Sequence, residues 1–87
     1  MKSKKMIISN PSGLHVRPAG ILAHAAEQCS SKVELIVGNS IINCRSILNI
    51  LSKSVRQGDE VELRCTGDTE EEDLKFMEQV IADELER

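Results

Sequence analysis

With 87 residues, the chain is long enough for one small domain, residues 1–87. A net charge of −3 and a single aromatic side chain, Phe76, argue against a protein that binds nucleic acid. No apolar run approaches the roughly 18 residues of a membrane span, and the N-terminal residues do not form a secretory signal peptide, so we expect a cytoplasmic protein without membrane insertion. Cys29, Cys44 and Cys65 lack metal-ligand spacing, so we expect reduced core residues and no metal site.

Charge is distributed unevenly along the chain. Residues 1–58 contain eight Lys and Arg against two acids, whereas residues 59–87 contain three against twelve. A basic surface on one side of the protein would favour anionic groups and an acidic protein partner. Alternatively, the acids simply belong to the last helix. The charge pattern leaves both interpretations open.

The first half of the chain predicts a strand, a helix and a second strand. Residues 6–8 predict a short strand, which the Asn-Pro-Ser-Gly turn at residues 10–13 ends. Apolar side chains recur at helical spacing over residues 16–28, and Pro18 suits the first turn of that helix. Apolar and charged side chains alternate over residues 33–37, which is typical of a half-buried strand.

The second half predicts a hairpin, a short helix, a strand and a final helix. Gly38-Asn39 is a plausible tight turn before a return strand over residues 40–44. Ser46 predicts the N-cap of a short helix, and residues 61–65 alternate as a strand. Thr69 and Glu72 then predict a capping box at the start of the last helix.

The predicted order is therefore β-α-β-β-α-β-α. Alternating strands imply a sheet with one wet face, and the helices must cover the other face. This arrangement is an α+β fold of the open-faced sandwich type.

His15 directly precedes the first predicted helix, and Arg17 follows two residues later. Neutral imidazole, with an ordinary pKa of about 6.5, is a nucleophile near neutral pH and can accept a phosphoryl group. Free N–H groups at a helix start bind phosphate, and a guanidinium offers a planar fork of donors that matches phosphate oxygens. In this interpretation Ser12, Val16 and Pro18 would position the phosphate. On local features alone, an ordinary surface histidine near a helix cap is the commoner case.

The run Gly13-Leu14-His15-Val16-Arg17-Pro18-Ala19 resembles the active-site signature of HPr, the histidine-containing phosphocarrier of the bacterial phosphoenolpyruvate:sugar phosphotransferase system. Ser46 and the apolar helix after it resemble the regulatory serine region of the family. Chain length and element order fit from end to end. The resemblance implies one HPr-like domain, with a four-stranded antiparallel sheet in the order 1-4-2-3 that three helices cover.

The resemblance also implies a function. HPr is a carrier rather than an enzyme and needs no cofactor. His15 would accept phosphate on Nδ1 from phosphorylated enzyme I and pass it to sugar-specific enzyme II A components during sugar uptake, while Arg17 stabilises the phosphate. We expect the protein to be a monomer.

Ser46 has a plain interpretation as a helix cap and a further one from the family. In the Gram-positive type of HPr, the matching serine is phosphorylated by an ATP-dependent HPr kinase/phosphorylase. A phosphoserine at a helix N-terminus suits the helix dipole, so the fold should survive, but a charge of about −2 would change docking. Repulsion from enzyme I and a link to a catabolite-control transcription factor are the effects expected from the resemblance.

The short helix after Ser46 contains more apolar residues than two turns can bury on one face. Leu48 is expected to point outward, where an exposed apolar group beside His15 would dock a protein partner. We expect Ile47, Leu48, Leu51 and Lys53 to form the docking surface. The alternative is an apolar helix that merely packs against the first one.

This surface is also where the chain departs from the family. HPr commonly has glycine at the position of Asn49, leucine at Lys53, glycine at Ser54 and alanine or threonine at Gly20. These changes leave the phosphate chemistry intact but alter the surface that partners touch. Lys53 adds positive charge, which is consistent with an acidic partner.

Two other functions compete with the phosphocarrier. One is an HPr-like regulatory paralogue that acts through phosphorylated Ser46 and binds a transcription regulator. Its known relatives often lack the active histidine, so His15 argues against it. The other is a plain α/β binding module that uses its sheet face, for which a single aromatic residue gives no stacking platform.

Overall fold

The computed structural model describes residues 1–85 and contains the predicted order of elements. In chain order these are β1 (Lys2–Ile7), α1 (Val16–Glu27), β2 (Lys32–Val37), β3 (Ser40–Asn43), α2 (Ile47–Ser52), β4 (Glu60–Thr66) and α3 (Glu70–Leu85). The strands form one antiparallel sheet in the order β1-β4-β2-β3, as the family resemblance implies. No helix within the described residues is long and apolar enough to cross a membrane.

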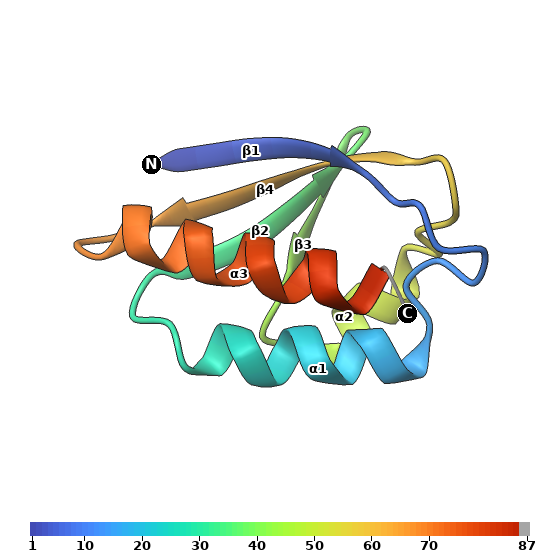
Figure 1. Cartoon of the computed structure of the whole chain (residues 1–87), viewed down its shortest axis with the longest axis horizontal. Helices are drawn as coiled ribbons and strands as arrows, with labels where there is room; N and C mark the ends of the chain where they lie inside the picture. The colour runs from blue at the N-terminus through green and yellow to red at the C-terminus, as the bar shows by residue number, and fades with distance from the viewer. Residues whose placement is uncertain (86–87) are drawn as a thin grey trace.

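The helices lie on one face of the sheet, and α1 and α3 run side by side across it (Figure 1). Alternate side chains of β2 and β4 point into the core between sheet and helices, while the intervening side chains face the open side. The largest fully buried side chains are Ile8, Leu22, Leu35, Ile42, Ile50, Leu63 and Met77. The fold is therefore the predicted open-faced sandwich.

Strand β1 starts at Lys2, four residues before the predicted start, and ends at Ile7. Its first residues lack an apolar pattern, but six residue pairs join it to β4 through the backbone. Lys2 also pairs with Glu71 of α3 (Nζ–Oε1 3.4 Å), and Lys4 lies 4.0 Å from Glu78. These long-range contacts define the strand, and single-sequence periodicity does not report them.

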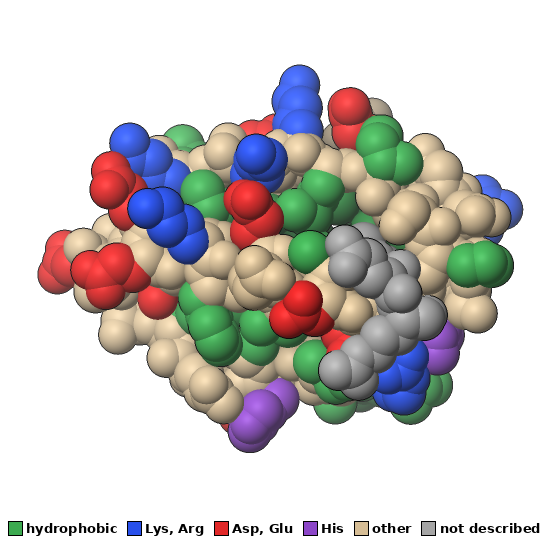
Figure 2. Space-filling model, viewed as in Figure 1, with side chains coloured by type: hydrophobic (Ala, Val, Ile, Leu, Met, Phe, Trp, Pro, Cys, Tyr) green, Lys and Arg blue, Asp and Glu red, His purple; other side chains and the backbone are tan. Residues whose placement is uncertain are grey.

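The same ion pairs decide between the two interpretations of the charge pattern. The acids of the last third belong mainly to α3, where they lie beside the lysines of β1, as the adjacent red and blue side chains in Figure 2 show. At this end of the molecule, the basic residues of the first half of the chain are therefore paired with acids of the last helix.

Helix α3 does not begin with the predicted capping box. The hydroxyl of Thr69 donates to Oδ2 of Asp73 (2.7 Å), and the N–H of Gly67 donates to Oε1 of Glu70 (3.1 Å). Asp73 also accepts from the N–H of Ser31 (2.9 Å). The carboxylate of Asp73 thus ties the start of α3 to the segment before β2, a role that the local sequence does not indicate.

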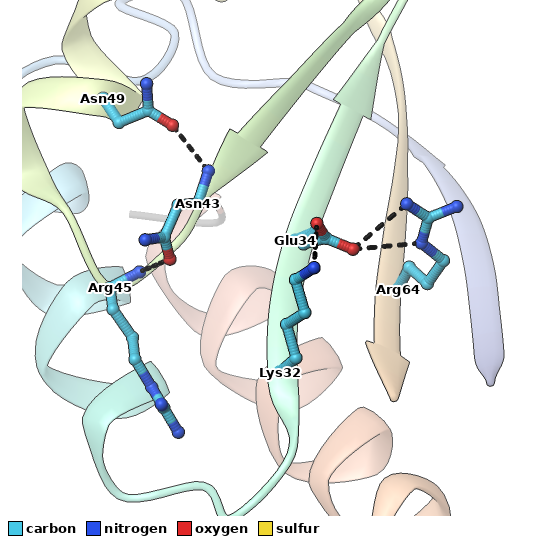
Figure 3. A network of polar contacts seen from close by, with 6 residues as sticks. All are labelled: Lys32, Glu34, Asn43, Arg45, Asn49 and Arg64. Carbon is cyan, nitrogen blue, oxygen red and sulfur yellow. Dashed lines mark hydrogen bonds and ion pairs between the residues drawn. The ribbon is translucent and has the colours of Figure 1, made fainter. Parts of the chain in front are cut away.

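One carboxylate on the open face of the sheet is buried. Glu34 is only 8% exposed, yet Arg64 donates to its Oε1 from both Nε (3.2 Å) and a terminal nitrogen (3.0 Å), and Lys32 approaches Oε2 (3.4 Å) (Figure 3). A buried charge is tolerated only when it is paired and hydrogen-bonded. The two cations on neighbouring positions provide that compensation.

The residue after the C-cap of α2 is a serine in a backbone conformation that favours glycine. Lys53 is the C-cap, and the following Ser54 has φ of +50°. Helices usually place glycine at this left-handed position, because a Cβ there is strained. The HPr family commonly has glycine here, so Ser54 holds a glycine conformation at a cost.

We expect Ser54→Gly to stabilise the protein by about 0.5–1 kcal/mol, since relief of the left-handed strain exceeds the added entropy of the unfolded chain. Urea denaturation checks this. Ser52→Gly is the matched control, because Ser52 lies in the regular last turn of α2 and glycine there should destabilise. Equal effects of both substitutions would contradict the role of the positive φ.

The three cysteines are buried and unpaired, as predicted. Burial raises the pKa of Cys29 to about 11, that of Cys44 to about 12 and that of Cys65 to about 11. The thiolate is the reactive form, so these thiols are inert in the folded protein.

We therefore expect none of the three thiols to react with a disulfide reagent such as DTNB at mildly alkaline pH in the native protein. All three should react at once in denaturing guanidinium chloride. Absorbance at the reagent's thiolate band measures both. Fast reaction of any thiol in the native state would show that its burial or its raised pKa is incorrect.

Candidate functional site

His15 is the N-cap of α1, and its ring is exposed. Its backbone is extended (φ −91°, ψ −167°), and its carbonyl accepts the first intrahelical hydrogen bond from the N–H of Ala19 (3.0 Å). The side chain makes no capping hydrogen bond. Both ring nitrogens are thus left out of the helix cap and can meet a partner.

The loop before His15 is fixed against the segment that precedes β4. Gly13 has φ of +62°, and a Cβ on it would collide with the carbonyl of Val55. The next residue, Leu14, is 5% exposed and donates its N–H to that same carbonyl (3.1 Å). Asn10 closes the loop by accepting from the N–H of Gly13 (3.1 Å) with its carbonyl. Because Leu14 points into the core, the following residue is presented outward.

The start of α1 supplies the other residues that the motif predicted. Val16 and Arg17 precede the first intrahelical donor, so their N–H groups lie at the positive end of the helix. Pro18 is buried in the first turn, where it has no N–H to leave unpaired. Ser12 is exposed in the loop just before. An anion bound at His15 would therefore meet free backbone donors.

Arg17 is held by an acid from the far end of the chain. Its terminal nitrogen lies 2.9 Å from Oε1 of Glu84, whose side chain is 7% exposed, whereas the side chain of Arg17 is 52% exposed. Glu84 was not predicted as a site residue. A signal exists, because Glu84 continues the buried stripe of Met77 and Ile81 on α3, and an acid on an apolar stripe indicates a paired charge.

Helix α2 is positioned by a short network of side-chain amides. Ser46 is its N-cap, and its hydroxyl accepts from the N–H of Asn49 (3.1 Å). Oδ1 of Asn49 accepts from the N–H of Asn43 (2.6 Å), and Oδ1 of Asn43 accepts from the N–H of Arg45 (3.0 Å) (Figure 3). Asn49, where the family commonly has glycine, therefore fastens α2 to the end of β3.

Arg45 joins this network to α1. Its guanidinium donates to the carbonyls of Ala26, Cys29 and Ser31, at the end of α1 and in the loop that follows. Helix ends leave carbonyls without partners, and a cation there is also favoured by the helix dipole. Arg45 fixes the spacing between Ser46 and α1, a role that sequence reasoning missed.

The predicted docking residues differ in exposure. Leu48 is 80% exposed and Ile47 is 43% exposed, whereas Leu51 is half-buried against the core. Lys53 is exposed at the end of α2. Val16 beside His15 is also exposed, at 69%. The exposed residues of α2 and of the start of α1 thus include both aliphatic side chains and cations.

Comparison with known proteins identifies the arrangement. Residues 2–83 match the family model described as the PTS HPr component phosphorylation site. The chain is 32% identical over 82 residues to the phosphocarrier protein HPr of Mycoplasma pneumoniae, covering 93% of each chain.

Solved structures agree with this match. HPr-C-His from Thermoanaerobacter tengcongensis superposes with a TM-score of 0.91 at 36% identity, covering 100% of this chain and 98% of that one. The Bacillus subtilis catabolite repression protein Crh, solved as an intertwined dimer with a swapped domain, gives 0.75 at 30% identity with 97% of each chain covered. The fold, the motif around His15 and these matches together show that the chain belongs to the HPr family, the phosphocarrier proteins of the phosphotransferase system.

Proposed function

We propose that this protein, as a single HPr-like domain of residues 1–87, carries a phosphoryl group on His15 from phosphorylated enzyme I to sugar-specific enzyme II A components during sugar uptake. The observation that supports this most directly is the exposed His15 ring at the start of α1, free of any capping bond. The protein acts as a carrier, because the phosphohistidine is both the product of one step and the substrate of the next.

The chemistry is an exchange of one nitrogen–phosphorus bond for another. A lone pair on Nδ1 of His15 attacks the phosphorus of the donor's phosphohistidine, the new bond forms and the donor nitrogen leaves with its electron pair. In the second transfer, a nucleophile of the acceptor protein attacks the phosphorus of the phosphorylated His15, and Nδ1 of His15 leaves with its electron pair. Little bond energy changes, so catalysis consists mainly of alignment and charge compensation. Backbone N–H groups of Val16 and Arg17 provide donors at the helix start.

Arg17 would change partner during the cycle. In the unphosphorylated protein its guanidinium binds Glu84 (2.9 Å). A phosphoryl group on His15 carries more charge than a carboxylate, and Arg17 is half-exposed and sits two residues away, so it can turn toward the phosphate. Glu84 is then a positioning residue, because its ion pair with Arg17 keeps the guanidinium in place between transfers.

We further propose that Ser46 is a regulatory phosphorylation site for an HPr kinase/phosphorylase, in a monomeric cytoplasmic protein. Phosphate on the Ser46 hydroxyl would face the start of α2, beside the exposed Ile47 and Leu48. Because α2 packs against α1, the helix that begins next to His15, the added charge would repel an acidic face of enzyme I and create a contact for a catabolite-control transcription factor.

A second candidate is a regulatory paralogue that works mainly through phosphorylated Ser46. Its support is the 30% identity to Crh over 97% of the chain. Labelling by ATP and an HPr kinase without any reaction with enzyme I would favour it over the carrier.

The carrier hypothesis is tested by incubation with enzyme I and labelled phosphoenolpyruvate. We expect an acid-labile, base-stable label in the wild type, none in His15→Ala, and full labelling of Ser46→Ala as the control. Mass spectrometry of the intact chain and its peptides locates the group. A label that survives His15→Ala would place the phosphate elsewhere, and its absence from the wild type would reject the carrier.

The role of Glu84 is tested by Glu84→Gln. Loss of the carboxylate frees Arg17 for the phosphate, so the ratio of phosphorylated to unphosphorylated chain at equilibrium with enzyme I should rise about two- to fivefold, the range for a partly exposed ion pair of about 0.5–1 kcal/mol. Glu78→Gln is the matched control, since Glu78 is on the same helix but pairs with Lys4. A fall in the phosphorylated fraction of Glu84→Gln would contradict the exchange of partners.

A further inference from the structure

Arg56 is an exposed cation beside the loop that leads to His15. A Cβ built on Gly13 would lie 2.9 Å from the Cα of Arg56, so the Cα atoms of these two residues are no more than about 4.5 Å apart. The N–H of Leu14 donates to the carbonyl of Val55 (3.1 Å), which joins the same two segments at the neighbouring residues. The backbone of Arg56 therefore lies next to the phosphate site, although it is far from His15 in the sequence.

The side chains of His15 and Arg56 both leave this contact toward solvent. Leu14 is 5% exposed and Val55 is 3% exposed, so the two hydrogen-bonded residues point into the core. The residue that follows each of them is exposed. His15 comes two residues after Gly13, so its Cα lies at most about 12 Å from that of Arg56. An extended arginine side chain and an imidazole that carries a phosphoryl group are together long enough to span this separation.

The fold fixes the backbone of Arg56 but does not use its guanidinium. The N–H of Arg56 donates to Oδ2 of Asp59 (2.9 Å), and its carbonyl accepts from the N–H of Asp59 (3.1 Å). Within residues 1–85, the guanidinium makes no ion pair, whereas that of Arg17 lies 2.9 Å from Glu84. An arginine with a fixed backbone and an unpaired, exposed guanidinium is available to an anion that arrives from solvent.

We propose that Arg56 binds the phosphoryl group on His15, as a second cation in addition to Arg17. Arg56 compensates phosphate charge without first breaking an ion pair, whereas Arg17 must leave Glu84. A planar guanidinium donates to two phosphate oxygens at once, so Arg56 also orients the group. The inference rests on the proposed function, since it assumes that His15 carries phosphate.

The test separates phosphate binding from docking of enzyme I, because it uses phosphoramidate as a small phosphoryl donor in parallel with enzyme I. Nδ1 of His15 attacks the phosphorus of phosphoramidate, a new nitrogen–phosphorus bond forms, and ammonia leaves with the electron pair of the broken bond. We expect Arg56→Gln to slow this reaction about two- to fivefold, the range of one solvent-exposed charge pair, and to slow phosphorylation by enzyme I at least as much. Arg56→Lys should lose less, because it keeps the charge but not the fork of donors.

Lys75→Gln is the matched control, since Lys75 is an exposed cation on α3 and its loss changes the net charge equally. Its rates with both donors should equal those of the wild type. Phosphorus magnetic resonance of the phosphorylated chains gives a second readout, because a guanidinium that is hydrogen-bonded to the phosphoryl group shifts its signal. The signal should move in Arg56→Gln and stay in place in Lys75→Gln.

An unchanged phosphoramidate rate or an unchanged phosphorus signal in Arg56→Gln would overturn the inference. This holds even if enzyme I alone were slowed, since that pattern is one of docking rather than of phosphate binding. Failure of enzyme I to phosphorylate the wild-type chain would instead reject the proposed function, and the reaction with phosphoramidate would still test Arg56.

Discussion

The contact between Gly13 and the carbonyl of Val55 positions everything else at the site. Only glycine fits this approach, because its φ is positive and a Cβ would collide with the carbonyl. The same carbonyl accepts the N–H of Leu14, whose side chain is then buried. Directly after these two residues comes His15, the exposed cap of α1, which begins at Val16. In the proposed carrier function, this contact would place the nucleophile at a helix start that attracts phosphate.

A second set of contacts holds α2 beside α1. Arg45 links the turn before α2 to the carbonyl end of α1, and Asn49 links α2 to β3. The exposed side chains of Ile47 and Leu48 are therefore carried by a helix that is tied to both α1 and β3, although α2 has only six residues. Such contacts suit the proposed carrier function, because alignment supplies most of the catalysis in phosphoryl transfer.

Much of this arrangement could be predicted from the sequence. Apolar periodicity located most elements, and the family motif indicated both the sheet order and His15. Long-range pairing could not be predicted, because it depends on register rather than on local pattern: Lys2 and Lys4 form a strand only because β4 and α3 lie beside them. The place of Glu84 on the buried stripe of α3 indicates a paired charge, but not that its partner is Arg17, 67 positions away in the sequence. At Ser54 the sequence shows that the usual glycine of the family is replaced, but only the structure shows the positive φ that makes this replacement costly.

The central claim is that phosphate on His15 takes Arg17 from Glu84. Nuclear magnetic resonance of the phosphorylated, ¹⁵N-labelled chain tests it most directly, by following the phosphorus, the His15 ring nitrogens and the Arg17 guanidinium together. We expect a phosphorus–nitrogen coupling to Nδ1 of His15 and a shift of the Arg17 guanidinium signals on phosphorylation that is absent at Arg45. Arg17 signals that stay at their unphosphorylated positions, still bound to Glu84, would contradict it.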